Sequence, residues 1–401
     1  MSLSDTRPRV VFLINSLTGG GAERIMARLI THSMAHSHHY EMHLVLLDKA
    51  PEAYSVPDWI AVHRLGTAGS MAASLGVALR CLRALEPDIC LSFLTRANLV
   101  NVICARLLGY KALISERVSP SSHHRRGAGA KLARILTRYI YPKADVVICP
   151  SAGVAADLID NFGVPPPKVT TIPNPTDREA LHRAATQPAQ FPTSRPYFVA
   201  MGRLVENKNF ALLLQAFARS TPEYDLVLIG DGPLRDQLRL LAHRLGLAHR
   251  VHFTGFLENP FPLILRARAF ISSSDAEGFP NALAEAMMLG IPVIATNCRS
   301  GPAELLGEEP ALEVSALYGA RHGLLVPVGD VAALAKALTM MSSDGFRDVQ
   351  AVRAAEGAAR YQMQPAIDAY WQVMQVSLPQ RMSPQSENRC RKAKPQDRET
   401  L

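Results

Sequence analysis

The stretch SSSDAEGFPNALAEAMMLGIPVIATNCRSGPAELL, at positions 272–306, carries residues whose types and spacing suit the binding of hydroxyl groups. Its apolar pattern predicts a strand that ends before Glu277, a turn at residues 278–281, and a helix that begins near Asn281. Glu277 and Glu285, eight positions apart, then flank a helix N-terminus whose free N–H groups bind oxygen atoms. A carboxylate in this setting can accept hydrogen bonds from two vicinal hydroxyls. Glu285 alone is equally well explained as an acidic residue that stabilises the start of its helix.

Arg203 and Lys208 lie in MGRLVENKNF, the segment that follows a predicted strand at residues 196–202. Two cations five positions apart at the end of a strand can hold a diphosphate from two sides and supply the charge that a metal ion supplies elsewhere. The chain has no Asp-x-Asp pair of the kind that could hold magnesium on such a phosphate. We therefore expect neither a metal site nor a cofactor. As an isolated pair, the two cations are also typical of a solvated surface.

A glycine triplet follows the first predicted strand, in LTGGGAERIMARLI. Gly20 and Gly21 open the next helix, where missing side chains and unpaired N–H groups let an anion approach closely. A simple tight turn explains the triplet as well. The spacing is not the GxGxxG of dinucleotide-binding proteins, and Asp48, after the second strand, is followed by loop, so a dehydrogenase is disfavoured.

Strand and helix patterns alternate along most of the chain, as in a parallel sheet covered on both faces. The predicted strands are at residues 9–15, 42–47, 88–93, 112–116, 145–150, 196–202, 224–230, 250–256, 269–274, 291–296 and 322–328. A proline-rich interruption between Val164 and Pro196 indicates a domain boundary. We expect two doubly wound α/β domains, with ligands at the carboxyl ends of their strands.

The domain prediction has four parts. Residues 1–178 form a first Rossmann-like domain, and residues 179–360 form a second one. Residues 361–380 form a C-terminal helix that packs on either domain, and residues 381–401 form a disordered basic tail.

The composition narrows the class of protein further. With 401 residues, 48% of them hydrophobic, the chain exceeds a small stapled scaffold and is not disordered as a whole. It shows neither a membrane-spanning run nor a secretory signal, and its six cysteines form no CxxC pair, so we expect a cytoplasmic protein. The net charge of +8 favours an anionic partner without choosing between nucleic acid, phosphorylated substrate and acidic membrane. The His-rich segment 31–43 reads as a solvated helix end, because it lacks metal-ligand spacing.

Between Arg117 and Lys143 the chain has seven Lys or Arg residues and no Asp or Glu. The run AKLARILTRYIY places its basic residues at helical intervals and its apolar residues toward another face. A basic amphipathic helix of this kind can lie on an anionic bilayer or receive a phosphorylated acceptor. An ordinary surface helix accounts for the pattern nearly as well.

Taken together, GGGAER, GRLVENKNF, GDGP, EGFPNALAE, SGPAELL and GLLVPVGD resemble the motifs of retaining glycosyltransferases of family 4, which have the GT-B fold. The resemblance runs from about residue 9 to about residue 376 and implies two domains that face each other across a cleft. It implies that residues 1–178 lie on the acceptor side and that residues 179–360 bind the nucleotide-sugar donor. It implies an enzyme that moves a hexose or N-acetylhexosamine from a nucleotide-sugar to a lipid-linked or polysaccharide acceptor, with retention of anomeric configuration and without metal. Relatives with a GFPN turn favour UDP-sugars, and many act at the cytoplasmic membrane face. No nucleic acid partner is expected.

By this resemblance, Arg203 and Lys208 neutralise the diphosphate and Glu285 holds the ribose hydroxyls. Glu277 and the turn formed by Gly278, Phe279, Pro280 and Asn281 contact the donor sugar, and Gly20 and Gly21 approach the diphosphate from the first domain.

The sequence departs from the family at ISERVSP. Many relatives have a His there that touches the donor sugar, so Glu116 or Arg117, or His123 or His124 from the next loop, would have to replace it. Two other functions stay open: a nucleotide-sugar epimerase of the same fold, and a protein without catalysis that binds nucleotide-sugar or anionic membrane. Retention of both the cationic and the acidic pair argues against loss of catalysis.

Overall fold

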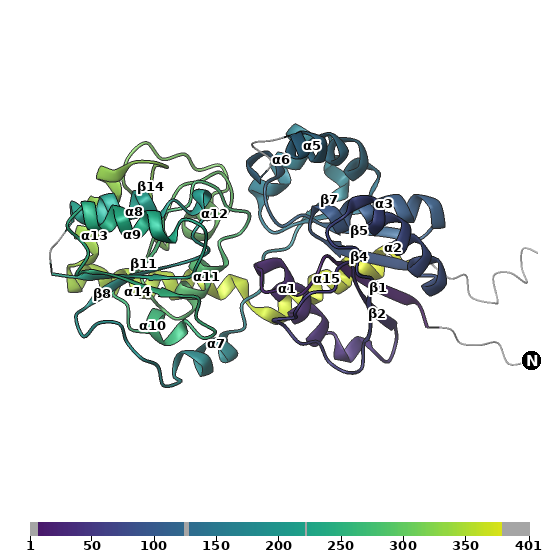
Figure 1. Cartoon of the computed structure of the whole chain (residues 1–401), viewed down its shortest axis with the longest axis horizontal. Coiled ribbons are helices and arrows are strands. Elements are labelled where there is room, and N and C mark those ends of the chain that lie inside the picture. The colour runs from purple at the N-terminus through teal and green to yellow at the C-terminus, as the bar shows by residue number, and fades with distance from the viewer. Residues whose placement is uncertain (1–6, 124–127, 221–222, 379–401) are drawn as a thin grey trace, which may run out of the picture.

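The computed structural model describes residues 7–123, 128–220 and 223–378. It has two α/β domains, each built on a seven-stranded sheet, and Figure 1 shows them side by side. This confirms the predicted pair of doubly wound domains. The predicted basic tail at residues 381–401 lies outside the described residues.

The first sheet is parallel throughout, in the order β3-β2-β1-β4-β5-β6-β7. Its strands are β1 (Arg9–Ile14), β2 (Glu41–Leu46), β3 (Ala61–Arg64), β4 (Ile89–Phe93), β5 (Lys111–Ser115), β6 (Val146–Cys149) and β7 (Val169–Thr171). Its helices are α1 (Gly21–Thr31), α2 (Met71–Leu85), α3 (Thr95–Leu108), α4 (Pro120–His123), α5 (Ala128–Ile140) and α6 (Ala152–Phe162). Central strands such as β1 are buried on both faces, which explains their continuous apolar sequences.

The second sheet has the order β10-β9-β8-β11-β12-β14-β13, with only the edge strand β13 antiparallel. Its strands are β8 (Tyr197–Met201), β9 (Asp225–Ile229), β10 (Val251–Gly255), β11 (Phe270–Ser272), β12 (Val293–Thr296), β13 (Tyr318–Ala320) and β14 (Gly323–Val326). Its helices are α7 (Arg178–Ala185), α8 (Phe210–Ala218), α9 (Arg235–Arg244), α10 (Phe261–Leu265), α11 (Asn281–Met288), α12 (Pro302–Gly307), α13 (Val331–Met341) and α14 (Asp344–Ala358).

The strand order reverses between β1 and β4 in the first sheet and between β8 and β11 in the second. At such a switch point the two neighbouring connections leave for opposite faces of the sheet and open a crevice at the carboxyl ends of the strands. The glycine triplet follows β1, the Arg203 segment follows β8, and Glu277 follows β11. The topology therefore gathers the candidate residues at the two switch points.

The last helix, α15 (Met363–Ser377), crosses back from the second domain and packs on the first (Figure 1). Trp371 is buried there, its indole N–H donates to Ser33 Oγ at 2.7 Å, and its ring stacks on His36 with centroids 4.0 Å apart. Where the chain crosses, the Thr176 N–H donates to the Tyr361 carbonyl at 2.8 Å. The two domains are thus joined twice, at neighbouring points.

Among the residues that the structure describes, no helix is long and apolar enough to cross a membrane.

Candidate functional site

The segments that follow β8 and β11 bring Lys208 and Glu277 into contact. Lys208 Nζ lies 2.5 Å from Glu277 Oε1, and Ser274 Oγ donates to the same oxygen at 2.6 Å. The lysine and glutamate side chains are 26% and 10% exposed, so the pair is largely screened from water. A cation and a carboxylate held this closely at a switch point can bind the two ends of a ligand that carries both phosphate and hydroxyl groups.

The two segments are fastened to each other by further hydrogen bonds. Ser273 Oγ donates to the Lys208 carbonyl at 2.9 Å, and Asn209 Nδ2 donates to Asp275 Oδ1 at 2.9 Å. The Asp275 N–H donates to the Asn207 carbonyl at 2.8 Å. These bonds fix the backbone on both sides of the ion pair, so the pair is held in place before any ligand binds.

Arg203 lies in the same connection but projects outward. Its side chain is exposed and makes no ion pair with the residues that the structure describes. Its backbone is fixed, because the Gly202 N–H donates to the Ile229 carbonyl at 3.0 Å and the Leu204 N–H donates to the Asp231 carbonyl at 2.9 Å. The GDGP motif explains this close approach, since a Cβ at Gly230 would overlap the carbonyl oxygen of Gly202. Arg203 is therefore a cation on a rigid loop, available to an anionic ligand.

Glu285 lies on α11 and faces the first domain. Its side chain is 2% exposed, and its Oε1 lies 2.6 Å from Arg24 Nη2 on α1. Arg24 follows the glycine triplet in GGGAER, but the sequence reasoning did not single it out, because an arginine in a first helical turn has no distinctive spacing.

The turn before α11, at residues 278–281, has three buried residues and one that is partly exposed. Phe279 and Pro280 are buried, and the Phe279 ring meets Tyr361 edge to face with centroids 5.4 Å apart. Gly278 is buried as well, and its carbonyl accepts a hydrogen bond from Ser151 Oγ of the first domain at 2.8 Å. Asn281 is partly exposed and accepts a hydrogen bond from Asn174 Nδ2 at 2.8 Å.

The side chains of Phe279 and Pro280 belong to the second domain's core and to the close packing of the turn. The contact between the backbone of this turn and a donor sugar stays a prediction. Gly278 is needed for domain contact, because a Cβ there would overlap the carbonyl oxygen of Arg117.

The glycine triplet faces the start of α11 across the domain boundary, and Figure 1 shows α1 and α11 on the facing sides of the two domains. A Cβ at Gly21 would lie 2.9 Å from Asn281 Nδ2, and Gly20 caps α1 without a side-chain hydrogen bond. The N-termini of α1 and α11 thus lie close together, and both carry the positive end of a helix dipole. Such a place favours an anion. At α1 the carboxylate of Glu23 lies beside Gly20.

The structure places Glu116 in the interior of the first domain, which corrects its prediction as a substrate contact. It is fully buried, and its carboxylate accepts hydrogen bonds from Tyr141 Oη at 2.5 Å, Thr95 Oγ1 at 3.3 Å and the Arg117 N–H at 3.0 Å. Burial raises the pKa of Glu116, partly offset by these donors.

Arg117 is buried too, and its guanidinium donates to Ser115 Oγ and to Tyr370 Oη on α15. It therefore ties α15 to the first domain instead of meeting a substrate. The other candidates for the missing histidine, the side chain of His123 and the whole of His124, lie outside the described residues.

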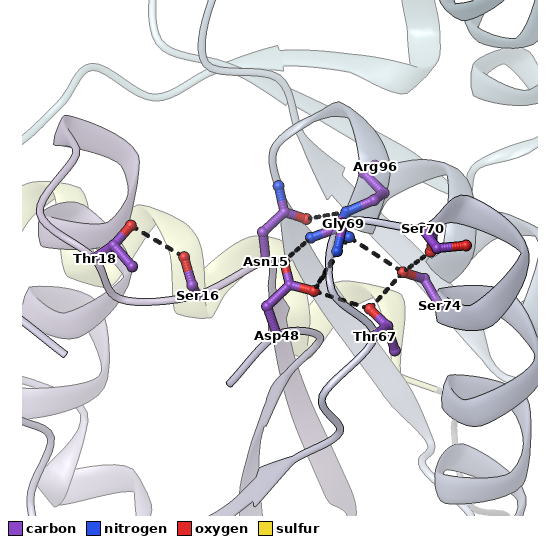
Figure 2. Close-up of polar contacts among 9 residues, drawn as sticks. All are labelled: Asn15, Ser16, Thr18, Asp48, Thr67, Gly69, Ser70, Ser74 and Arg96. Carbon is purple, nitrogen blue, oxygen red and sulfur yellow. Dashed lines mark hydrogen bonds and ion pairs between the residues drawn. The ribbon is translucent and has the colours of Figure 1, made fainter. Parts of the chain in front are cut away.

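A polar cluster occupies the carboxyl edge of the first sheet, around an ion pair of Asp48 and Arg96 (Figure 2). Arg96 Nε also donates to Asn15 Oδ1 at 3.3 Å, and Thr67 Oγ1 donates to Asp48 Oδ1 at 3.0 Å. Partial burial acts to raise the pKa of Asp48, but the hydrogen bonds from Arg96, the Gly69 N–H and Thr67 outweigh it, and the pKa is lowered. Asp48 thus fixes the loops that follow the strands by binding residues from several of them. The sequence alone did not indicate this role.

A second carboxylate also crosses the boundary. Glu304, in the SGPAELL motif, accepts from the N–H groups of Ala152 and Gly153 at 2.8 and 2.9 Å, at the start of α6. Hydrogen bonds between the domains therefore form both at the turn before α11 and at the start of α6.

Several known proteins resemble the chain. A model of group 1 glycosyl transferases matches residues 183–358, and one of glycosyltransferase family 4 matches residues 19–180. The N-acetylgalactosamine-N,N'-diacetylbacillosaminyl-diphospho-undecaprenol 4-alpha-N-acetylgalactosaminyltransferase of Campylobacter jejuni is 30% identical over 349 residues, covering 83% of this chain and 90% of that protein.

Solved structures agree in fold. HepE of Anabaena, crystallised in complex with UDP, has a TM-score of 0.71 at 19% identity and covers 92% of this chain and 100% of its own. Sucrose-phosphate synthase of Thermosynechococcus elongatus has a TM-score of 0.75 at 18% identity and covers 92% of this chain and 98% of its own. These likenesses confirm the GT-B fold. With the Campylobacter jejuni relative matched over most of both chains, and with one family model on each domain, the chain belongs to glycosyltransferase family 4.

Proposed function

We propose that this glycosyltransferase moves a hexose or N-acetylhexosamine from a UDP-sugar to a lipid-linked or polysaccharide acceptor, with retention of anomeric configuration and without a metal ion. The observation that carries the proposal is the Lys208–Glu277 pair, held at 2.5 Å at the switch point of the second domain and flanked by the exposed Arg203.

Both cations stabilise the negative charge that develops during the reaction. The bond between the sugar C1 and the β-phosphate oxygen breaks, and C1 bonds to an acceptor hydroxyl oxygen, whose proton is released. Negative charge develops on the departing diphosphate, so the fixed charges of Lys208 and Arg203 stabilise the transition state more than the ground state. Both are therefore assigned as catalytic residues.

Glu277 is the third catalytic residue. Its Oε1 is taken by Lys208 and Ser274, and its partly exposed carboxylate is available to donor-sugar hydroxyls and to positive charge that develops at C1. Glu285, Asn281 and the backbone at Gly278 bind the donor beside it, while Gly20 and Gly21 approach the diphosphate from the first domain.

The acceptor side of the proposal draws on the relative and on α5. The relative from Campylobacter jejuni is named for a diphospho-undecaprenol substrate, which is a lipid-linked sugar. On α5, the apolar side chains of Leu132, Ile135 and Tyr139 are 57%, 54% and 68% exposed, and Lys131 and Arg134 are exposed beside them.

Apolar and basic side chains exposed together on one helix suit an anionic membrane surface. In contrast, Leu136 and Ile140 on the same helix pack against the core, so α5 is anchored while its outer side stays free. We infer that the enzyme works as a peripheral protein at the cytoplasmic face, where it meets its acceptor.

The test is a donor screen with product analysis. Purified protein is incubated with UDP-glucose, UDP-galactose and their N-acetyl forms in EDTA, with and without a polyprenyl-diphosphate sugar, and products are identified by mass spectrometry and NMR. We expect a new α-glycosidic bond only with acceptor. A changed sugar nucleotide without acceptor would identify an epimerase, and UDP binding without turnover would identify a binding protein. Dependence on added Mg²⁺ or Mn²⁺ would contradict the metal-independent mechanism.

A further inference from the structure

The ion pair of Arg24 and Glu285 joins the two domains at the expected donor site. Arg24 lies in the first turn of α1, three residues after the last glycine of the triplet, and Glu285 lies on α11 of the second domain. Arg24 Nη2 is 2.6 Å from Glu285 Oε1, and the two side chains are 23% and 2% exposed. The contact is therefore a mostly desolvated charge pair that forms only when the two domains face each other.

The second oxygen of the same carboxylate has no partner. Glu285 Oε2 is buried and accepts no hydrogen bond from the residues that the structure describes. A buried carboxylate oxygen without a donor is costly, and such atoms in native proteins usually mark a missing ligand or water. The unsatisfied oxygen has room for one donor of hydrogen bonds, which is what a ribose hydroxyl offers.

A second guanidinium group, that of Arg28, lies near Arg24 and Glu285. Arg28 lies one turn further along α1, and burial together with the neighbouring Arg24 charge lowers the pKa of Arg28. Two guanidinium groups on one helix face repel each other, and a nearby carboxylate offsets this repulsion. The negative charges of Glu285 and Asp177 do so, since both act to raise the pKa of Arg28. The first domain therefore presents positive charge to the one carboxylate that is expected to hold the donor ribose.

We propose that Arg24 is a positioning residue of the donor site: it holds Glu285 Oε1 across the domain boundary, so that Oε2 accepts a hydrogen bond from a ribose hydroxyl of the nucleoside diphosphate. The proposal rests on the proposed function, because it presumes a nucleotide-sugar donor. It adds that the ribose subsite is complete only when both domains contribute. A donor that displaced Arg24 from Glu285 would have the opposite consequence, since removal of Arg24 would then strengthen donor binding.

The experiment compares UDP with its 2′-deoxy and 3′-deoxy analogues by calorimetry, on wild-type protein and on Arg24→Gln, Arg24→Lys and Glu285→Gln. The wild type should prefer UDP over at least one deoxy analogue. In Arg24→Gln we expect UDP affinity to fall roughly tenfold to a hundredfold and this preference to shrink to near one. Arg24→Lys, which keeps the charge, should restore part of the preference. The double variant Arg24→Gln/Glu285→Gln should bind UDP about as weakly as the weaker single variant, because both substitutions disrupt the same Arg24–Glu285–ribose contact.

Arg64→Gln is the matched control. Arg64 forms an ion pair of the same length, 2.6 Å to Glu52, on the surface of the first domain, and its loss should leave all three Kd values unchanged. If Arg24 had a merely structural role, Arg24→Gln would weaken the binding of all three ligands equally and leave the ratio of UDP affinity to deoxy-analogue affinity unchanged. That result would overturn the proposal. Tighter UDP binding in Arg24→Gln overturns it as well. Failure of the wild type to bind UDP would instead refute the proposed donor, and with it this role of Arg24.

Discussion

Replacement of Lys208 by Met separates the catalytic from the structural part of the Lys208–Glu277 pair. The substitution removes the ammonium group that lies 2.5 Å from Glu277 Oε1 and leaves Ser274 Oγ, at 2.6 Å, as the donor to that oxygen. Glu277 is only 10% exposed, so water offsets little of the negative charge on its carboxylate once the ammonium group is gone. The loss of one partner of a charged hydrogen bond corresponds to about 1 to 3 kcal/mol of stability. A domain of this size should lose roughly 2 to 12 °C in Tm.

The effect on turnover should be larger. If Lys208 stabilises the charge on the departing diphosphate, kcat should fall by about 10² to 10³, or ~3 to 4 kcal/mol of activation free energy. Adding Glu277→Gln to Lys208→Met should return part of the lost Tm, because the uncompensated charge is gone, but should return no activity. Lys111→Met, which breaks a 3.0 Å ion pair with Asp145 in the first domain, is the control and should keep kcat.

The assay is release of UDP in steady state, with Tm measured on the same samples. The reasoning fails if Lys208→Met keeps kcat within about twofold while Tm falls, since the pair would then be structural only. It also fails if the double variant recovers both quantities.

Three further predictions concern other parts of the molecule. Leu132→Glu, on the exposed side of α5, should leave Tm unchanged and reduce flotation with anionic liposomes at low salt; equal flotation of variant and wild type would make α5 an ordinary surface helix. Asp48→Asn should lower stability at pH 7 by about 1 to 3 kcal/mol, because it weakens the pair with Arg96. Since the pKa of Asp48 is lowered in the folded state, its contribution is present above the unfolded pKa of about 3.9 and is lost as pH falls through the lower folded value, so wild-type but not Asp48→Asn stability should drop at this step in acid denaturation. Gly278→Ala should reduce kcat/KM by about 10²-fold, because the added methyl group overlaps the carbonyl oxygen of Arg117 and separates the domains; unchanged kcat/KM would show that this contact is open during catalysis.

The two-domain fold could be predicted because its strands are buried on both faces and therefore appear as short apolar runs. The short strands β3, β7 and β13 escaped prediction, since each has only three or four residues and each carries at least one exposed position. The antiparallel edge of the second sheet was equally invisible, because pairing partners are not encoded in local pattern.

The sequence placed Lys208 and Glu277 in loops after two strands of the second domain, but their direct contact depends on the pairing of β8 with β11, which only the structure shows. The partner of Glu285 did not follow from sequence either, since Arg24 lies more than half the chain away and in the other domain. The burial of Glu116 was missed for a related reason: its donors, Thr95 and Tyr141, come from other elements of the first domain. Contacts that depend on how elements pack cannot be read from local spacing.

The double link between the domains has a mechanical consequence. Thr176 and Gln362 form a parallel bridge, so the outgoing and returning chain segments run through one place. A single pivot permits the two halves to swing apart and to return in the same alignment, whereas sliding one half along the other would strain both segments. A swing about this pivot would therefore separate Arg24 from Glu285 on opening and bring the same two side chains back together on closing.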